Sequence, residues 1–340
     1  MILVDDFDFE LPPGLIAQEP VYPRDSARLL LVDRQTKKWE HSFFREISHH
    51  LYPGDVLVLN DTKVLPARFF GLKASSGGKV EILFLRKVGG NWECLLKPSR
   101  RVRPGQKIVL REDSAFSWIV EKRMGDTWLV RPLFSHEEEL FSRFGQVPTP
   151  PYVKNPHIQL ADYQTVFAHF PGSVAAPTAG LHFTPRLLEE LKQKKVRLAW
   201  VTLHVGLGTF QPVKSSQLEE HRLHQETYFL PDSTARLIME AKQEGKRVIA
   251  VGTTVVRVLE TVYLSFGTLK QAEGETELFI YPGFEFKVVD ALVTNFHLPR
   301  STLFMLVCAF AGTSFMKEVY REAINKKYRF FSFGDAMFIR

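Results

Sequence analysis

Apolar and polar positions alternate in short runs in the second fifth of the chain. Between about Gly71 and Pro132, segments such as KVEILFL, WECLLK and TWLVRPL are separated by turn signals, among them Gly77-Gly78 and Pro104-Gly105. Short strands punctuated by turns at this spacing are typical of a small β-barrel or sandwich. The segment HEEELFSRF then predicts a helix. VPTPPY after it predicts a linker, because proline cannot continue a helix.

The segments before and after this region have a different pattern of apolar and polar residues. LLLVD and DVLVLN before it predict buried strands, and beyond Pro151 predicted strands alternate with predicted helices. Such alternation favours an α/β layer fold with a mostly parallel sheet. The predicted strands lie at 29–33, 55–60 and 198–205, a helix at 233–244, and a strand, turn and helix at 248–260.

These two sequence patterns predict an α/β fold class with two domains. We expect a layered α/β main domain built from both ends of the chain, residues 1–68 and 151–340. A small β-barrel domain, residues 69–150, is inserted into it.

Composition limits the possible classes of protein but does not indicate a function. The 340 residues are 45% hydrophobic and 24% charged, which is typical of a globular chain with more than one core. The formal net charge of +6 suits a polyanionic partner and an ordinary basic enzyme equally. Cys94 and Cys308 cannot build a disulfide framework or a cysteine-rich zinc site, a pattern that suits a reducing cytosol.

Neither a signal peptide nor a membrane span is expected. The start, MILVDDFDFELP, is acidic and has no long apolar run. The most apolar stretch, Leu303 to Ala311, has about half the length that a bilayer crossing needs, so it predicts a buried helix.

The stretch AAPTAGLHFTPRLLEEL carries a histidine to the start of a helix. Thr184 is a good N-cap and Pro185 a good first helical residue, so a glycine-containing loop places His182 at the helix mouth. Backbone N–H groups and the helix dipole favour anions there.

Two further segments repeat this design. VIAVGTTVVRVLE predicts a strand, a turn and a helix that would present Thr253 and Thr254 at the carboxyl edge of a sheet. DALVTNFHLPRSTLFML predicts a strand that ends near Asn295 and His297, followed by a helix capped by Ser301. Taken alone, either turn is also explained without a ligand, as a segment that only reverses the direction of the chain.

VTLHVGLGTFQPV predicts a strand with His204 near its end, followed by Gly206 and Gly208. The two glycines allow close approach of a ligand to the backbone, although a tight turn explains them as well. The third glycine of a dinucleotide fingerprint is missing, so a Rossmann cofactor site is not supported. His182, His204 and His297 all lie in loops that can converge on one crevice, where they would transfer protons near neutral pH.

EEHRLHQETYF contains His221, His224, Glu226 and Tyr228. Two histidines and a carboxylate can hold a metal ion, but the spacing is not that of His-Glu-x-x-His. A polar, solvated connection remains an equal alternative.

A basic stretch lies in the predicted barrel. LLKPSRRVRPGQK holds five cations within eleven residues, which indicate either a solvated hairpin or contacts with phosphate. They are Lys97, Arg100, Arg101, Arg103 and Lys107.

Several long strings, in this order, resemble the S-adenosylmethionine:tRNA ribosyltransferase-isomerase family. They include NDTKVLPAR, YQTVFA, GSVAAPTAGLHFT, VTLHVGLGTFQPV, VGTTVVRVLE, DALVTNFHLPRSTL and YRFFSFGDAMFI, so the resemblance covers essentially the whole chain. Departures are small: Leu223 stands where the family has methionine, Lys63 where arginine is frequent, and Val255 where serine is frequent.

The resemblance implies an α/β domain with an inserted β-barrel and a reaction in queuosine biosynthesis. The enzyme would transfer and isomerise the ribosyl part of S-adenosylmethionine onto 7-aminomethyl-7-deazaguanine at the wobble position of tRNA. Epoxyqueuosine-tRNA, adenine and methionine would be the products. S-adenosylmethionine would be a co-substrate, with no prosthetic group and no metal, and the protein is expected to be a cytoplasmic monomer without a membrane anchor.

This chemistry needs a base for the carbon next to the sulfonium and proton donors for departing adenine. We assign these catalytic tasks, without further division, to His182, His204, His224, Glu226, Asp290 and His297. Substrate contacts are expected from Thr178, Gly180, Phe183, Gly206, Gly208, Thr253, Thr254 and Asn295. Contacts with tRNA are expected from Lys63, Arg68, Arg100, Arg101 and Arg103.

Three other functions are weighed against this reading. An S-adenosylmethionine-dependent tRNA methyltransferase would release S-adenosylhomocysteine instead of adenine. A noncatalytic tRNA-binding module would have no use for so many acid–base groups in loops. A metal-dependent hydrolase rests on His221 and His224 alone.

Overall fold

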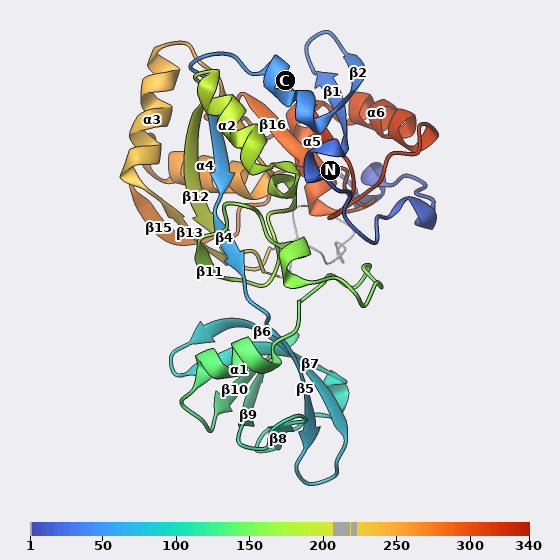
Figure 1. Ribbon diagram of the computed structural model, residues 1–340, viewed down its shortest axis with the longest axis vertical. Helices are drawn as coiled ribbons and strands as arrows, with labels where there is room; N and C mark the ends of the chain where they lie inside the picture. Colours follow the sequence, from blue (N-terminus) through green and yellow to red (C-terminus); the bar gives the residue numbers. More distant parts are fainter. Residues whose placement is uncertain (1, 207–217, 219–222) are drawn as a thin grey trace.

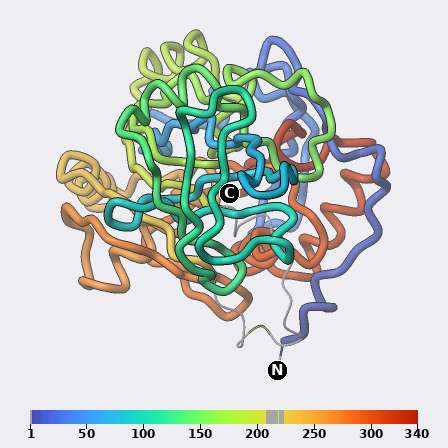
Figure 2. Tube along the Cα trace, turned by 90° about the horizontal axis from the view of Figure 1, so that it is seen from below, coloured from blue at the N-terminus to red at the C-terminus, as the bar shows by residue number. Residues whose placement is uncertain are grey.

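The computed structural model describes residues 2–206, 218 and 223–340. An α/β part and a separate β-barrel are joined by two crossings of the chain (Figure 1). In the view from below, the barrel lies in front of the middle of the α/β part (Figure 2).

The α/β part is organised around one nine-stranded sheet with the order β15-β13-β12-β3-β14-β16-β17-β1-β2. Its centre, β12-β3-β14-β16, is parallel as predicted. Outside this centre the prediction of a parallel sheet is wrong for most pairs: only β17 and β1 run parallel. The strands are β1 Arg28–Asp33, β2 Lys38–Phe43, β3 Val56–Asn60, β12 Arg197–Leu203, β13 Glu226–Leu230, β14 Val248–Val251, β15 Ala272–Thr276, β16 Ala291–Asn295 and β17 Ala336–Ile339.

Helices cover both faces of this sheet because its central strands are apolar on both sides. Val56 and Val58 of β3 belong to one core, whereas Leu57 and Leu59 belong to the other. The α-helices of this part are α2 Pro185–Gln193, α3 Asp232–Gln243, α4 Thr253–Phe266, α5 Thr302–Ala311 and α6 Thr313–Asn325.

Two predicted helix starts are confirmed in detail. The Leu187 N–H donates to Thr184 Oγ1 at the start of α2, and the Phe304 N–H donates to Ser301 Oγ at the start of α5. Helix α5 is buried, as its apolar sequence predicts. Within the described residues, no single helix has the length and apolarity for a membrane span, while the sharply bent pair α5 and α6 meets the criterion jointly.

The barrel is closed, in the order β10-β7-β6-β5-β8-β9. Its interior is filled by Trp118, Phe84 and Phe69, and helix α1 packs Phe141 against Phe69 and Phe84. Because the sheet is closed and has no free edges, the inserted domain is a barrel and not the sandwich that the sequence also allowed. The elements are β5 Arg68–Lys73, β6 Lys79–Val88, β7 Asn91–Lys97, β8 Lys107–Leu110, β9 Ser117–Met124, β10 Thr127–Pro132 and α1 Glu137–Phe144.

A two-stranded parallel ribbon lies on the side of the α/β part that faces the barrel (Figure 1). It consists of β4 Thr62–Val64, directly after β3, and β11 Phe170–Ser173. The chain enters the barrel after β4, so this ribbon lies beside the crossing. The short 3₁₀ helices are η1 Val4–Phe7, η2 Pro13–Leu15, η3 Arg24–Ser26, η4 Phe44–His50, η5 Ser99–Arg101, η6 Leu160–Tyr163 and η7 Thr178–His182.

Candidate active site

A cavity of about 1000 Å³ lies between the α/β part and the barrel. Its α/β wall is formed by the ends of β11, β12 and β13, which contribute Gly172, His204, Gly206, His224 and Glu226. The barrel contributes apolar and charged side chains from β6, β7, β10 and α1, namely Leu85, Arg86, Trp92, Glu93, Thr127, Glu137 and Phe141. Four of the predicted site residues therefore meet at one cavity.

A second group of predicted residues meets at the carboxyl edge of β14 and β16. Thr178, Thr253, Thr254, Asn295 and His297 line a small crevice of about 40 Å³. Val205 belongs to the walls of both the crevice and the large cavity, so the two are neighbours. Of the three histidines predicted to converge on one crevice, His297 lines this crevice, whereas His204 lines the large cavity beside it and His182 lines neither. The volume of the crevice holds no more than a water or two.

Two histidines of this group are buried. Asn295 accepts a hydrogen bond from Thr178 Oγ1 (3.0 Å) and its Nδ2 lies 3.1 Å from His182 Nε2, while the His182 ring stacks on Phe44. Burial, with repulsion from nearby arginines, lowers the pKa of His182 to about 3, and burial alone lowers the pKa of His297 to about 3. Both rings are neutral near pH 7 and are very weak bases.

The buried histidines make stability depend on pH. Their pKa values lie below the unfolded value of 6.5, so their contribution is complete above pH 6.5 and declines as the pH falls toward 3. From pH 7.5 to 5.5 we expect the free energy of unfolding to fall by about 2–3 kcal/mol from this pair. Urea unfolding at both pH values measures it. His157→Gln, at an exposed position, should keep the full pH dependence; a stability that does not change over this range contradicts the assignment.

His204 is held from two sides at the end of β12. Its Nδ1 lies 2.8 Å from Thr62 Oγ1, and its ring lies against Gly172, where a Cβ atom would come within 2.8 Å of Cε1. Nε2 has no partner among the described residues, and the side chain lines the cavity. Partial burial lowers the pKa of His204, which keeps the ring neutral and able to accept a proton at pH 7.

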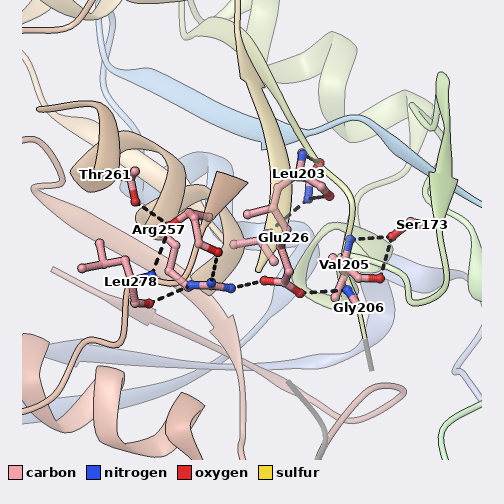
Figure 3. Close-up of polar contacts among 11 residues, drawn as sticks. Ser173, Leu203, Val205, Gly206, Glu226, Arg257, Thr261 and Leu278 are labelled. Atoms are coloured by element: carbon pink, nitrogen blue, oxygen red, sulfur yellow. Dashed lines mark hydrogen bonds and ion pairs between the residues drawn. The ribbon is translucent and has the colours of Figure 1, made fainter. Parts of the chain in front are cut away.

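Glu226 is held as an anion by a buried arginine. Its Oε1 accepts from the Gly206 N–H (2.8 Å) and its Oε2 pairs with Arg257 Nη1 of α4 (Figure 3). Arg257 also donates to the carbonyls of Leu278 (3.0 Å) and Thr276 (3.3 Å). With both oxygens occupied and a permanent charge beside it, Glu226 fixes the cavity wall and is not free to shuttle protons.

Two further side chains, which the sequence reasoning missed, hold the same wall. Asn60, at the end of β3, accepts from the Leu203 N–H (3.0 Å) and donates to the Leu203 carbonyl (3.1 Å). Ser173 Oγ accepts from the Val205 N–H (2.8 Å), as Figure 3 shows. Arg257 was missed as well, although an arginine inside the apolar run TTVVRVL was a usable signal of a buried ion pair.

Several predicted residues do not join either group. Asp290 precedes β16, so it lies at the opposite edge of the sheet from Asn295, and its carboxylate accepts from Lys242 Nζ (2.8 Å) and the Val248 N–H (2.8 Å). Gly180 makes room for Phe167 rather than for a ligand, because a Cβ there would lie 2.8 Å from the Phe167 ring.

Phe183 is fully buried against Phe44 in the core. Gly208 and His221 lie outside the described residues. Among the residues that the structure describes, no group of three potential ligands is placed to hold a metal ion.

The predicted tRNA contacts are spread over three places. Lys63 is exposed on β4, whereas Arg68 is partly buried and donates to the Thr149 carbonyl (2.7 Å). Arg100, Arg101 and Arg103 are exposed at the end of the barrel that lies away from the cavity. This follows from β7, which starts at the cavity with Trp92 and ends at Lys97, directly before the three arginines.

Known proteins similar to this chain share its full length. A curated protein of Thermotoga maritima named S-adenosylmethionine:tRNA ribosyltransferase-isomerase is 52% identical over 99% of both chains. One of the same name from Geobacter metallireducens is 51% identical over 99% of both chains. A crystal structure described as S-adenosylmethionine tRNA ribosyltransferase from Thermotoga maritima has 43% identity, covers 98% of this chain and 100% of its own, and superposes with a TM-score of 0.58.

The match extends to the family as a whole. The sequence model of the family described as "Queuosine biosynthesis protein" matches residues 4–339, a range that includes the cavity wall, the crevice and the barrel. The chain therefore belongs to the queuosine biosynthesis protein family.

Proposed function

We propose that this protein is the S-adenosylmethionine:tRNA ribosyltransferase-isomerase of queuosine biosynthesis. It transfers the ribosyl part of S-adenosylmethionine to 7-aminomethyl-7-deazaguanine at the tRNA wobble position and isomerises it, and epoxyqueuosine-tRNA, adenine and methionine are formed. The observation that carries this proposal is the cavity between the α/β part and the barrel, where His204, His224 and Glu226 meet a wall with the apolar faces of Trp92 and Phe141.

The charge of the side chains that line the cavity favours the binding of cationic reactants. Six carboxylates and two permanent cations line it, although the whole chain carries a net charge of +6. Arg257 neutralises Glu226 from behind the wall, and five carboxylates remain. Both the sulfonium donor and the aminomethyl group are cations in water, and an anionic cavity attracts them while it disfavours the phosphates of RNA.

The surroundings of each histidine indicate which proton transfer it can perform. We assign the base that removes the proton next to the sulfonium to His204, because its Nε2 has no hydrogen-bond partner in the part of the chain that the structure describes and its pKa is lowered by burial. His224 is exposed at the same cavity and is the candidate donor to departing adenine. His182 and His297 are neutral buried rings with pKa values of about 3, so they are poor proton acceptors and poor proton donors near pH 7. We assign them the structural role of maintaining the shape of the neighbouring crevice.

The barrel carries most of the positive charge and is our candidate for the tRNA backbone. Residues 69–150 contain 14 lysines and arginines and 9 aspartates and glutamates, so they account for +5 of the net +6. Arg100, Arg101 and Arg103 form no ion pair with any described residue and are free for phosphates. They follow the end of β7 that lies away from the cavity residue Trp92, so they would contact tRNA beyond the reacting base.

The boundaries at residues 68/69 and 150/151, a monomeric state, the cytoplasm as compartment and the absence of a prosthetic group belong to the same proposal. The family resemblance supports them, and the presence of two cysteines only, both buried, supports the cytoplasm as compartment.

Adenine release tests the function. The purified protein is incubated with S-adenosylmethionine and with tRNA that carries either the aminomethyl-deazaguanine or unmodified guanine at the wobble position. We expect adenine and methionine in a one-to-one ratio with the modified tRNA alone. S-adenosylhomocysteine in place of adenine would establish the methyltransferase, and tight tRNA binding with no small-molecule product would establish the binding module.

A further inference from the structure

The ribbon of β4 and β11 presents an aromatic side chain beside the cavity. Phe170, the first residue of β11, is 45% exposed, and the two residues after it, Pro171 and Gly172, line the cavity. The other exposed aromatic side chains among the described residues, such as Phe43 and Phe266, have no such neighbours.

The register of the ribbon determines the direction of Phe170. Phe170 is paired with Thr62, and directly paired residues of neighbouring strands point to the same face. Thr62 points toward His204, because its Oγ1 lies 2.8 Å from Nδ1 of that ring, which itself lines the cavity. Phe170 therefore stands on the same face of the ribbon as Thr62.

The backbone below this ring is rigid. The N–H groups of His169 and Phe170 both donate to the Asp61 carbonyl, at 2.7 and 3.2 Å, and the Leu65 N–H donates to the Ser173 carbonyl at 2.8 Å. Asp61 is itself buried and accepts from Thr202 Oγ1 (2.7 Å). A half-exposed ring on a fixed backbone loses little entropy when another flat group stacks on it.

A second ring accompanies Phe170. The exposed His169 ring lies 4.6 Å from the Phe170 ring in an edge-on arrangement. Lys63, on the neighbouring strand, is also exposed, but it is paired with Pro171 and therefore points to the other face of the ribbon. An exposed aromatic ring is a feature with which proteins bind single-stranded nucleic acid, because the ring stacks on a base.

We propose that this ribbon binds an unpaired base of the tRNA anticodon loop, adjacent in the RNA to the base that enters the cavity, and that Phe170 stacks on it. The proposal rests on the proposed function, since it takes tRNA as the substrate. Stacking on a neighbour would compensate for part of the free energy lost when the reacting base leaves its own stack.

The test uses the whole protein and an anticodon stem–loop RNA with 2-aminopurine next to the wobble position. Stacking quenches 2-aminopurine fluorescence, so binding and stacking are measured together. We expect Phe170→Ala to raise the Kd for this RNA by about 5- to 150-fold and to remove the quenching. Phe170→Trp should keep both, and the KM for S-adenosylmethionine should not change in either variant.

Two controls separate stacking from other effects. Phe266→Ala removes a ring of equal exposure, 47%, at the end of α4, and should leave Kd and quenching unchanged. The charge reversal R100E/R101E/R103E should lower the dependence of Kd on salt, whereas Phe170→Ala should weaken binding equally at all salt concentrations.

The inference is overturned if Phe170→Ala and Phe266→Ala behave alike, or if Phe170→Ala raises the KM for S-adenosylmethionine while RNA binding stays intact. Either result leaves the proposed function standing, because adenine release by the unaltered protein decides that function separately.

Discussion

Arg257→Met is expected to lower the free energy of unfolding by about 3–5 kcal/mol at pH 8, because it leaves the buried carboxylate of Glu226 without its countercharge. Arg257 and Glu226 are only 4% and 3% exposed in their side chains, so water cannot replace the lost partner. Two backbone carbonyls, those of Leu278 and Thr276, also lose their donor. Urea unfolding followed by circular dichroism measures the loss.

The origin of this loss can be separated from ordinary packing damage by a second change. Glu226→Gln in the Arg257→Met background should recover part of the loss, because it removes the buried charge that lacks a partner. Arg236→Met removes one partner of the exposed pair with Asp232 and should cost no more than about 0.5 kcal/mol. A loss of equal size in Arg257→Met with and without Glu226→Gln would show that the charge of Glu226 is not its cause.

Gly172→Ala is expected to reduce kcat for adenine release by about 10²- to 10⁴-fold while tRNA binding persists. The new Cβ would lie 2.8 Å from Cε1 of His204, and the backbone φ of +147° disfavours any side chain, so the His204 ring must leave its place beside Thr62. The expected size is that of a lost general base. Single-turnover rates and RNA binding, measured on the same preparation, separate the two effects.

A double-mutant cycle shows whether Gly172 acts through His204. In the His204→Ala background, Gly172→Ala should have almost no further effect on kcat, because the group that it displaces is already absent. Gly283→Ala, at φ +104° with open space around its Cβ, controls for backbone strain alone and should keep kcat. Additive losses in the cycle would assign the effect of Gly172 to the backbone instead.

Local features of this fold were predictable because they depend on neighbours in the sequence. The apolar runs at 29–33 and 55–60 became β1 and β3, Thr184 and Ser301 cap helices, and the turn-punctuated runs became strands of the barrel. Each of these follows from residue periodicity or from a cap that satisfies the next few N–H groups. The convergence of Thr253, Asn295 and His297 followed from the general position of loops at the carboxyl edge of a parallel sheet.

Contacts between distant segments were not predictable in the same way. Asn60 and Leu203 lie 143 positions apart, and only the pairing of β3 with β12 brings them together. Periodicity shows which face of a strand is buried and does not identify its neighbour in the sheet. For the same reason Asp290 was assigned to the site: its strand was predicted correctly, but it lies at the amino end of that strand.

The strand order also dictates a sequence of events during synthesis. Strand β17 follows all the other named strands in the chain, yet it lies between β16 and β1, so the hairpin of β1 and β2 cannot join the rest of the sheet until β17 has left the ribosome. The barrel strands β5 to β10, by contrast, come from one continuous segment with short loops and can pair as soon as that segment emerges. The barrel can thus be complete while the nine-stranded sheet is still open between β16 and β1, and the pairing of β17 closes that sheet last.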